Sequence, residues 1–460
     1  MIELLERKPR ILEGLKREWE RLEKSPSFST LPHYLTLSFE ISKIDIKGLV
    51  GHLHDHAPLS YWADRSGEKT FLGVGALHQT EGMEHLTGIE NIVNENPDLY
   101  YVGGINFDHL KNESKEWSSF RKGQFILPLL SYQKDEDRYF LKVNFPKSLL
   151  YNKNEQASYS FKVEKALSFS HYSTIQDPEM DPPAPSLTPV STILSPKKDN
   201  WNQMVQKCLA ELKSQKMQKV VLARKKIYKM ADTINPSLLF DTCQEENRVG
   251  NFTFLIRPHS NQAFLSFSPE RLFRIKNNTI LVDALAGTRP SNHHPEKDLL
   301  LEQELLSSKK DSFEHMVVCK TVLDKLNKIS KKVYMTKNMK VMKLSHVQHL
   351  HSEFEAELEK ETRLTDIISE LHPTPAVGGE PWAEAKSFIN GHESFERGLY
   401  ASPVGFISKN YTEFAVGIRS ALIDDKNLHV FGGAGIVLGS SPEKEWDETL
   451  SKMKSFEHYL

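Results

Sequence analysis

Apolar and polar positions alternate in some stretches of the chain and follow helical spacing in others. Residues 1–25 carry apolar side chains at helical intervals among charged ones, which predicts an amphipathic helix. Four later runs are rich in aromatic and β-branched residues, which is typical of strands. These runs are LSYWAD, TFLGVGAL, YVGGINF and RYFLKVNF.

The second half of the chain shows the same two patterns in longer groups. Residues 201–215 have helical spacing, and KVVLARKKIYKM at 219–230 contains a strand core. FTFLIRP, AFLSFSPERLFRI and TILVDALAG predict three close strands, before a helical stretch at about 295–330. KVMKLSHVQHLHSEFEAEL predicts strands again, and GLYASPVGFIS, TEFAVGIRSALI and LHVFGGAGIVLG predict an antiparallel meander before a last helix. Because strands come in consecutive groups, we predict an α+β fold with large antiparallel sheets rather than a βαβ barrel.

A proline-rich segment at 176–200, QDPEMDPPAPSLTPVSTILSPKKDN, separates the two halves. Its prolines exclude a continuous helix or a central strand, so we expect a connector. The predicted organisation is an N-terminal part, residues 1–199, that contributes to the sheet core, followed by a C-terminal domain, residues 200–460.

Composition narrows the classes of function. Basic and acidic residues nearly balance, with a formal net charge of -2, so charge gives no reason to expect nucleic acid. No apolar run approaches the ~20 residues of a membrane span, and the first helix lacks the apolar centre of a signal peptide. Cys208, Cys243 and Cys319 lie far apart, with neither metal-ligand spacing nor an even disulfide set. We therefore expect a cytoplasmic protein.

A glycine-rich turn precedes the last helix, in FGGAGIVLGSSPEKEWDETL at 431–450. Gly433, Gly435 and Gly439 resemble a dinucleotide-binding loop, but too few residues follow for the rest of a βαβ nucleotide unit. A tight turn after a strand is the simpler interpretation.

The last helix places acidic side chains beside an apolar stripe. Glu445, Glu448 and Lys452 fall on one face, and Trp446 and Met453 lie on the neighbouring face that packs inward. Two carboxylates at the margin of a core repel each other and lose solvation, and a divalent cation relieves both costs. The alternative is a solvated charged face.

Further motifs carry a resemblance to a known family. They are KVVLAR, FSPERL, ALAGTRP, DSFEHMVV, VQHL, HPTPAVGG, ERGLYASPVGF, FAVGIRSALI and GGAGIVLGSSPEKEWDET. In this order, across residues 201–460, they resemble the chorismate-utilising enzymes, and most of all the isochorismate synthase subgroup. YWADRSGEKTFLGVGA at 61–76 also resembles that subgroup, in its menaquinone-type form.

The resemblance implies a large α/β unit of antiparallel sheets packed together, with helices outside and the active site between the sheets. The implied reaction is an isomerisation of chorismate to isochorismate, in which water adds at ring C2 and the C4 hydroxyl leaves. This chemistry needs a base for the water and an acid for the leaving hydroxyl. The product feeds menaquinone or siderophore synthesis; the N-terminal part favours menaquinone.

By the same resemblance, Lys219 in KVVLAR is the general base and Glu270 in FSPERL is the general acid. A lysine accepts a proton only as the neutral amine, which apolar neighbours favour. Glu270 must be protonated to donate, so burial should raise its pKa and the neighbouring arginines should point away.

The resemblance also assigns a Mg2+ site to Glu314 in DSFEHMVV together with Glu445 and Glu448. Mg2+ prefers a few carboxylates plus water and substrate oxygen. The substrate oxygen would come from the ring carboxylate. Asp311, one turn before Glu314, is a candidate to help through water.

The remaining implied residues bind the substrate. Arg419, Tyr400 and the backbone at Gly433 take the enolpyruvyl carboxylate, because arginine offers a fork of donors and glycine lets a ligand approach the main chain. The further expected contacts are Lys452 to a carboxylate, His349 to the ring region, Thr288 to the leaving group or Glu270, and Ala376 beside the substrate.

Three relatives on this scaffold stay as alternatives. Ammonia-using anthranilate and aminodeoxychorismate synthases need an amidotransferase partner and lack a catalytic lysine at this point, so Lys219 indicates water as nucleophile and no obligatory amidotransferase. Salicylate synthases keep the lysine but tend to have threonine where this chain has Ala376. A non-catalytic chorismate-binding protein is the alternative from another class.

Overall fold

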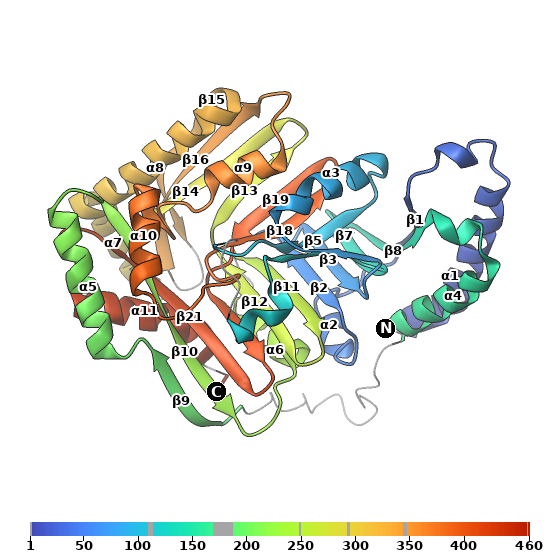
Figure 1. The fold of residues 1–460 in the computed structure, drawn as a ribbon, viewed down its shortest axis with the longest axis horizontal. Coiled ribbons are helices and arrows are strands. Elements are labelled where there is room, and N and C mark those ends of the chain that lie inside the picture. Colours follow the sequence, from blue (N-terminus) through green and yellow to red (C-terminus); the bar gives the residue numbers. More distant parts are fainter. Residues whose placement is uncertain are drawn as a thin grey trace.

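Two large antiparallel sheets form the body of the protein (Figure 1). The computed structural model describes residues 2–108, 114–168, 187–247, 250–291, 295–343, 347–457 and 459–460. Every strand pairing among these residues is antiparallel. The prediction of an α+β fold with large antiparallel sheets is confirmed.

The first sheet has twelve strands and the second has nine. The first sheet runs, in spatial order, through β1 (Tyr34–Ile41), β8 (Arg138–Pro146), β7 (Leu130–Asp135), β3 (Lys69–Val74), β2 (Leu59–Ala63), β11 (Phe252–His259), β12 (Gln262–Ser268), β20 (Ser420–Asp424), β21 (Asn427–Ile436), β10 (Lys219–Met230) and β17 (Gly379–Glu380), with β9 (Pro189–Ser195) also paired to β10. The second sheet runs through β15 (Ser330–Lys343), β16 (Val347–Leu358), β14 (Thr279–Pro290), β13 (Arg271–Lys276), β19 (Tyr411–Val416), β18 (Pro403–Ser408), β5 (Tyr100–Gly104), β6 (Gln124–Leu127) and β4 (His78–Thr80).

Helices lie around these sheets (Figure 1). They are α1 (Ile2–Glu23), α2 (Leu49–His52), α3 (Leu86–Glu95), α4 (Lys153–Ala166), α5 (Lys198–Lys213), α6 (Pro236–Asn247), α7 (Pro295–Ser307), α8 (Lys309–Ile329), α9 (Leu364–Leu371), α10 (Trp382–His392) and α11 (Pro442–Glu457). The helical stretch predicted at 295–330 is thus two helices, α7 and α8. Within the described residues, no helix is both long and apolar enough to cross a membrane.

The main core lies between the sheets. Trp62 of β2 contacts Phe406 of β18 with ring centroids 5.8 Å apart, which joins the two layers. Alternate residues of β12 face opposite ways: Phe264 belongs to the core between the sheets, and Phe267 packs on the helix side against Phe240 of α6. Because successive side chains of a strand point to opposite faces of the sheet, β12 contributes side chains to a separate core on each face.

Strands of the N-terminal part complete both sheets. β2 pairs with β11 of the first sheet, and β5 pairs with β18 of the second. The segment predicted as a connector contributes β9, which pairs with β10 and ends before α5 begins at Lys198. Residues 176–186 of that segment lie outside the described part of the chain.

Two predicted strands are each divided between the sheets. The predicted meander is therefore correct only for two separate pairs, β18 with β19 and β20 with β21, which lie in different sheets. AFLSFSPERLFRI forms β12 in the first sheet and β13 in the second, and Pro269 and Glu270 make the crossing. TEFAVGIRSALI likewise forms β19 and β20, with the crossing at residues 417–419. Proline has no N–H for a ladder, and Arg419 has a φ of 47°, so neither crossing continues as a regular strand.

The two crossings lie side by side. The Glu270 carbonyl accepts a hydrogen bond from Val416 N at 3.0 Å, and the Arg419 carbonyl accepts one from Phe267 N at 3.1 Å. Each crossing is thus fixed by the strand that leads into the other. This arrangement brings Glu270 and Arg419 to one edge of the space between the sheets.

Candidate active site

A cavity of about 250 Å³ lies where the two crossings meet β10, β21, α8 and α11. It gathers nearly every residue that the sequence analysis singled out. These are Lys219, Glu270, Glu314, His349, Ala376, Tyr400, Arg419, Gly433, Glu445, Glu448 and Lys452. Thr288 pairs through its backbone with His349 between β14 and β16, but its side chain lies outside the described residues.

Glu270 is a buried carboxyl group of the cavity, with 6% of its surface exposed. Burial raises its pKa to about 7, and the Thr374 hydroxyl donates to Oε1 at 3.3 Å. Arg271 points away, to Glu413 at 2.8 Å and Asp283 at 3.2 Å. Glu270 therefore holds a proton near neutrality, because burial dominates its surroundings and Arg271 pairs with other carboxylates.

Lys219 begins β10 and is buried, but its partner differs from the sequence expectation. Its Nζ donates to Glu314 Oε1 of α8 at 2.6 Å, instead of lying among apolar side chains alone. The positive charge of Lys219 is the main reason that the pKa of Glu314 falls below its usual range. Sequence reasoning missed this pair because the two residues are 95 positions apart.

Two glycines of β21 make room for candidate side chains of the site. A Cβ on Gly435 would lie 2.9 Å from Lys219 Cε, and a Cβ on Gly433 would lie 2.7 Å from the Tyr400 hydroxyl. Any larger residue would displace a candidate site residue. Gly435 was noted only as part of a turn, and no sequence signal tied it to Lys219.

The strand register decides where the main chain of Gly433 points. Ala223, which faces Gly433 on β10, sends its N–H to Glu393 Oε1, so this pair exchanges no ladder hydrogen bonds. The N–H and carbonyl of Gly433 therefore point away from β10. On that side β21 is paired with β20 only as far as Val430, so Gly433 lies beyond the pairing. Its carbonyl accepts a hydrogen bond from Lys452 Nζ at 3.0 Å.

Arg419 and Tyr400 supply donors at the same end of the cavity. Burial lowers the pKa of Arg419 to about 10, and among the described residues no carboxylate lies close enough to offset that burial. Burial also raises the pKa of Tyr400, so it stays a neutral phenol, and its ring stacks on Phe431 with centroids 5.1 Å apart. A buried arginine without an acidic partner is suited to receive an anion.

The polar face of α11 forms the rim of the cavity. Glu445 and Glu448 lie there with Lys452, which donates to Glu448 at 2.8 Å. Trp446 packs inward, and the Arg224 guanidinium lies 3.4 Å from the centroid of its ring. The predicted amphipathic division of α11 is thus confirmed, since its apolar side is anchored and its carboxylates face the cavity.

His349 lies against the ladder between β14 and β16. Its Nδ1 is 3.1 Å from the Gly287 carbonyl, and burial lowers its pKa to about 3. The ring is therefore neutral. Because Nδ1 must carry the proton to bond a carbonyl, Nε2 is the acceptor nitrogen.

Several residues that line the cavity or contact a lining residue were not assigned from the sequence. Arg289 pairs with Asp311 at 2.9 Å, so Asp311 already has a cationic partner beside the proposed metal ligands. Lys310 adds positive charge near Glu314, and Thr374 contacts Glu270. Arg289 lies within ALAGTRP and Thr374 within HPTPAVGG, so both belong to motifs already singled out. The motifs did not indicate which residues these two side chains contact.

The carboxylates predicted to bind Mg2+ face the cavity from two helices. Glu314 comes from α8, and Glu445 and Glu448 come from α11. Burial raises the pKa of Glu445, and the charge of Glu448 adds to that rise. Carboxylate oxygens are the ligand type that a hard divalent cation such as Mg2+ prefers.

Comparison with known proteins agrees with this geometry. Residues 21–460 match the family model described as chorismate binding enzyme. The chloroplastic isochorismate synthase of Catharanthus roseus is 32% identical over 78% of this chain, and the match spans 62% of that protein, less than two thirds. Isochorismate synthase MenF of Haemophilus influenzae is 29% identical, covering 85% of this chain and 84% of that protein.

A solved structure shows the same fold. The menaquinone-specific isochorismate synthase MenF of Escherichia coli superposes with a TM-score of 0.83 at 24% identity, covering 98% of this chain and 99% of that one. The family model spans both sheets and every lining residue of the cavity. This chain therefore belongs to the family of chorismate-binding enzymes.

Proposed function

We propose that this protein is an isochorismate synthase that isomerises chorismate to isochorismate with Mg2+. The observation that carries the proposal is the meeting in one cavity of Lys219, at the start of β10, and Glu270, in a crossing between the two sheets. A base and an acid with such different surroundings suit a reaction that takes one proton and gives another.

Lys219 takes a proton from water as the water oxygen bonds to ring C2. Both ring double bonds shift, the bond from C4 to its hydroxyl breaks, and Glu270 protonates that hydroxyl so that it leaves as water. One water enters and one leaves, so substrate and product are isomers. Lys219 Nζ lies 2.6 Å from Glu314 Oε1, so a cation held by Glu314 would compete with Lys219 for that carboxylate.

The two carboxylates of chorismate bind at opposite ends of the cavity. Arg419, Tyr400 and the main chain of Gly433 take the enolpyruvyl carboxylate, with Lys452 beside them. His349 accepts a hydrogen bond from the substrate through Nε2. The buried charge of Arg419 gains a counter-ion when the substrate enters, which favours binding of an anion there.

Glu314, Glu445 and Glu448 would hold Mg2+. When bound, the metal would supply positive charge to the ring carboxylate and draw electron density toward it. The likeness to MenF proteins over most of both chains supports a role in menaquinone synthesis.

The test is incubation of purified protein with chorismate and Mg2+, followed by chromatographic separation of products. Isochorismate alone is expected. Salicylate with pyruvate, or an aminated ring when ammonium is supplied, would replace the proposal by one of the related activities. No turnover in wild-type protein that binds chorismate would indicate the non-catalytic alternative.

A further inference from the structure

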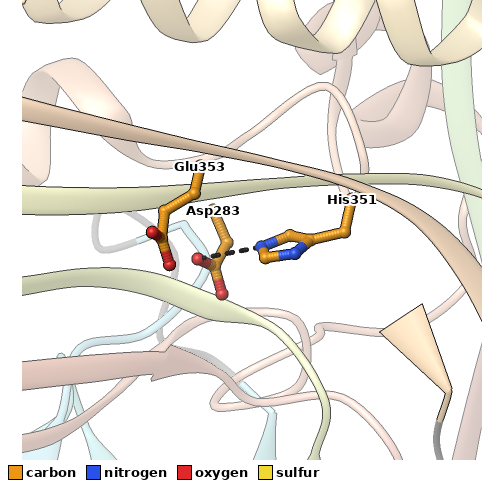
Figure 2. A group of neighbouring side chains, drawn as sticks. All are labelled: Asp283, His351 and Glu353. Atoms are coloured by element: carbon orange, nitrogen blue, oxygen red, sulfur yellow. Dashed lines mark ion pairs between the residues drawn. The ribbon is translucent and has the colours of Figure 1, made fainter. Parts of the chain in front are cut away.

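A buried cluster lies behind the cavity, on the ladder between β14 and β16. Figure 2 shows Asp283, His351 and Glu353, with the His351 ring toward the Asp283 carboxylate; His351 Nε2 is 3.3 Å from Asp283 Oδ1. The spacing of their ligand atoms would suit a metal ion. Two arginines, however, already contact the Asp283 carboxylate, and their charges oppose a further cation there.

Asp283 instead joins the two arginines that flank the general acid. Arg65 Nη2 donates to Asp283 Oδ2 at 2.5 Å, and Arg271 Nη1 donates to Asp283 Oδ1 at 3.2 Å. The same Arg65 nitrogen donates to the Pro269 carbonyl at 2.6 Å. The residues on both sides of Glu270 are therefore held through one carboxylate.

Packing holds the two guanidinium groups in place. The Phe252 ring has the Arg65 guanidinium at 4.8 Å from its centroid and the Arg271 guanidinium at 5.5 Å. The Trp62 ring stacks on the Phe252 ring, with the two ring centroids 5.4 Å apart. Burying the charges of Arg65, Arg271 and Asp283 costs desolvation free energy. In return, their contacts restrict the motion of the chain where Glu270 crosses between the sheets.

Arg65 comes from the turn between β2 and β3, within YWADRSGEKTFLGVGA. No residue of this motif lines the cavity, so the proposed reaction leaves its polar residues without a role. The distance of 204 residues between Arg65 and Pro269 makes this hydrogen bond a link between the N-terminal part and the acid.

We propose that Arg65 is a positioning residue for Glu270: by bridging Asp283 and the Pro269 carbonyl, it fixes the crossing that aims the acid at the leaving hydroxyl. This inference rests on the proposed function, since it presumes that Glu270 donates a proton. Misplacement of a reacting group by about 1 Å costs up to about 100-fold in rate, so such a link would act on kcat.

The experiment compares Arg65→Met and Arg65→Lys with wild-type protein on chorismate. Arg65→Met keeps length and packing but removes both hydrogen bonds, and kcat should fall about 10- to 100-fold while KM changes less than about twofold. A lysine ammonium donates to both oxygens with poorer geometry, so Arg65→Lys should lose about three- to tenfold. Millimolar guanidinium chloride should restore part of the activity of Arg65→Met.

Arg257→Met is the matched control, because Arg257 is a buried arginine of β11 that bonds Ser237 at 2.9 Å and Ser260 rather than the neighbours of Glu270. It should lower Tm and leave kcat per folded molecule unchanged. The inference would be overturned if the kcat of Arg65→Met stays within about twofold of wild type. It would also be overturned if the kcat of Arg65→Met falls no further than that of Arg257→Met and guanidinium does not restore it. If Arg65→Met does not fold, an unchanged kcat in Arg65→Lys overturns it. Absence of turnover in wild type would instead overturn the proposed function.

Discussion

Glu270 and Glu314 line one cavity but lie in opposite surroundings. Glu270 belongs to a crossing between sheets, where burial raises its pKa to about 7 and its carboxyl group accepts a hydrogen bond from the Thr374 hydroxyl. Glu314 belongs to a helix at the rim, where Lys219 at 2.6 Å lowers its pKa. The same side chain therefore favours its protonated form in one place and its ionised form in the other.

The difference follows from how each region is built. A crossing removes a side chain from water and surrounds it with backbone that has its own partners, so the neutral acid is favoured. On the face of α8 that lines the cavity, the charge of Lys219 outweighs burial, so the pKa of Glu314 falls and its carboxylate stays ionised. The proposed acid and this proposed metal ligand thus differ by their surroundings rather than by residue type.

The largest expected effect comes from removal of the acid. Glu270→Gln keeps shape but cannot give a proton, so kcat should fall about 100- to 10,000-fold with little change in KM or in Mg2+ dependence. Steady-state kinetics with chorismate measure this. Glu443→Gln, an exposed neighbour on α11, is the control and should behave as wild type. Activity within tenfold of wild type would remove Glu270 from the role of acid.

The corresponding change at the rim should act on the metal instead. Glu314→Gln removes one carboxylate from the proposed Mg2+ site. A change one shell away from a metal typically costs about 10- to 100-fold in affinity, so loss of a ligand should raise the Mg2+ needed for half-maximal activity at least about tenfold. Activity titrations with Mg2+ and isothermal calorimetry test this. An unchanged Mg2+ requirement would contradict the assignment of Glu314 as a ligand.

The pH profile should reveal the raised pKa of Glu270. The acid is active when protonated, so kcat/KM of wild type should decline above about pH 7, by about tenfold per pH unit. Stability should follow the same group: its pKa is higher in the folded than in the unfolded state, so its contribution weakens as pH rises through about 7. Glu270→Gln should therefore gain Tm relative to wild type between pH 6 and pH 8. A parallel decline of both proteins would count against the buried neutral acid.

The smallest effect is expected at Thr374. Its hydroxyl favours the ionised form of Glu270, so Thr374→Val should raise the pKa further and move the alkaline decline to higher pH by less than about one unit. The shift should be absent in Thr321→Val, whose hydroxyl bonds Val317 in α8. A shift to lower pH would show that Thr374 acts on Glu270 in the opposite sense.

The sequence alone determined the parts that repeat a local rule. The period of α11 placed Glu445, Glu448 and Lys452 on one face, and consecutive strand groups indicated antiparallel sheets, because both depend on spacing within a segment. Motif resemblance brought Glu270, Arg419 and Gly433 into one proposed site, although no local pattern showed how they meet.

Tertiary structure decided the rest. Two apolar runs were predicted as single strands, but each divides between the two sheets. Both halves of each run have strand periodicity, so the sequence pattern does not show the division. The packing of the two sheets determines where each run crosses. The partner of Lys219 and the reach of Arg65 to the neighbours of Glu270 also depend on contacts between residues about 100 to 200 positions apart. Such contacts leave no periodic signal, since the burial and charge around a side chain arise only when distant segments meet.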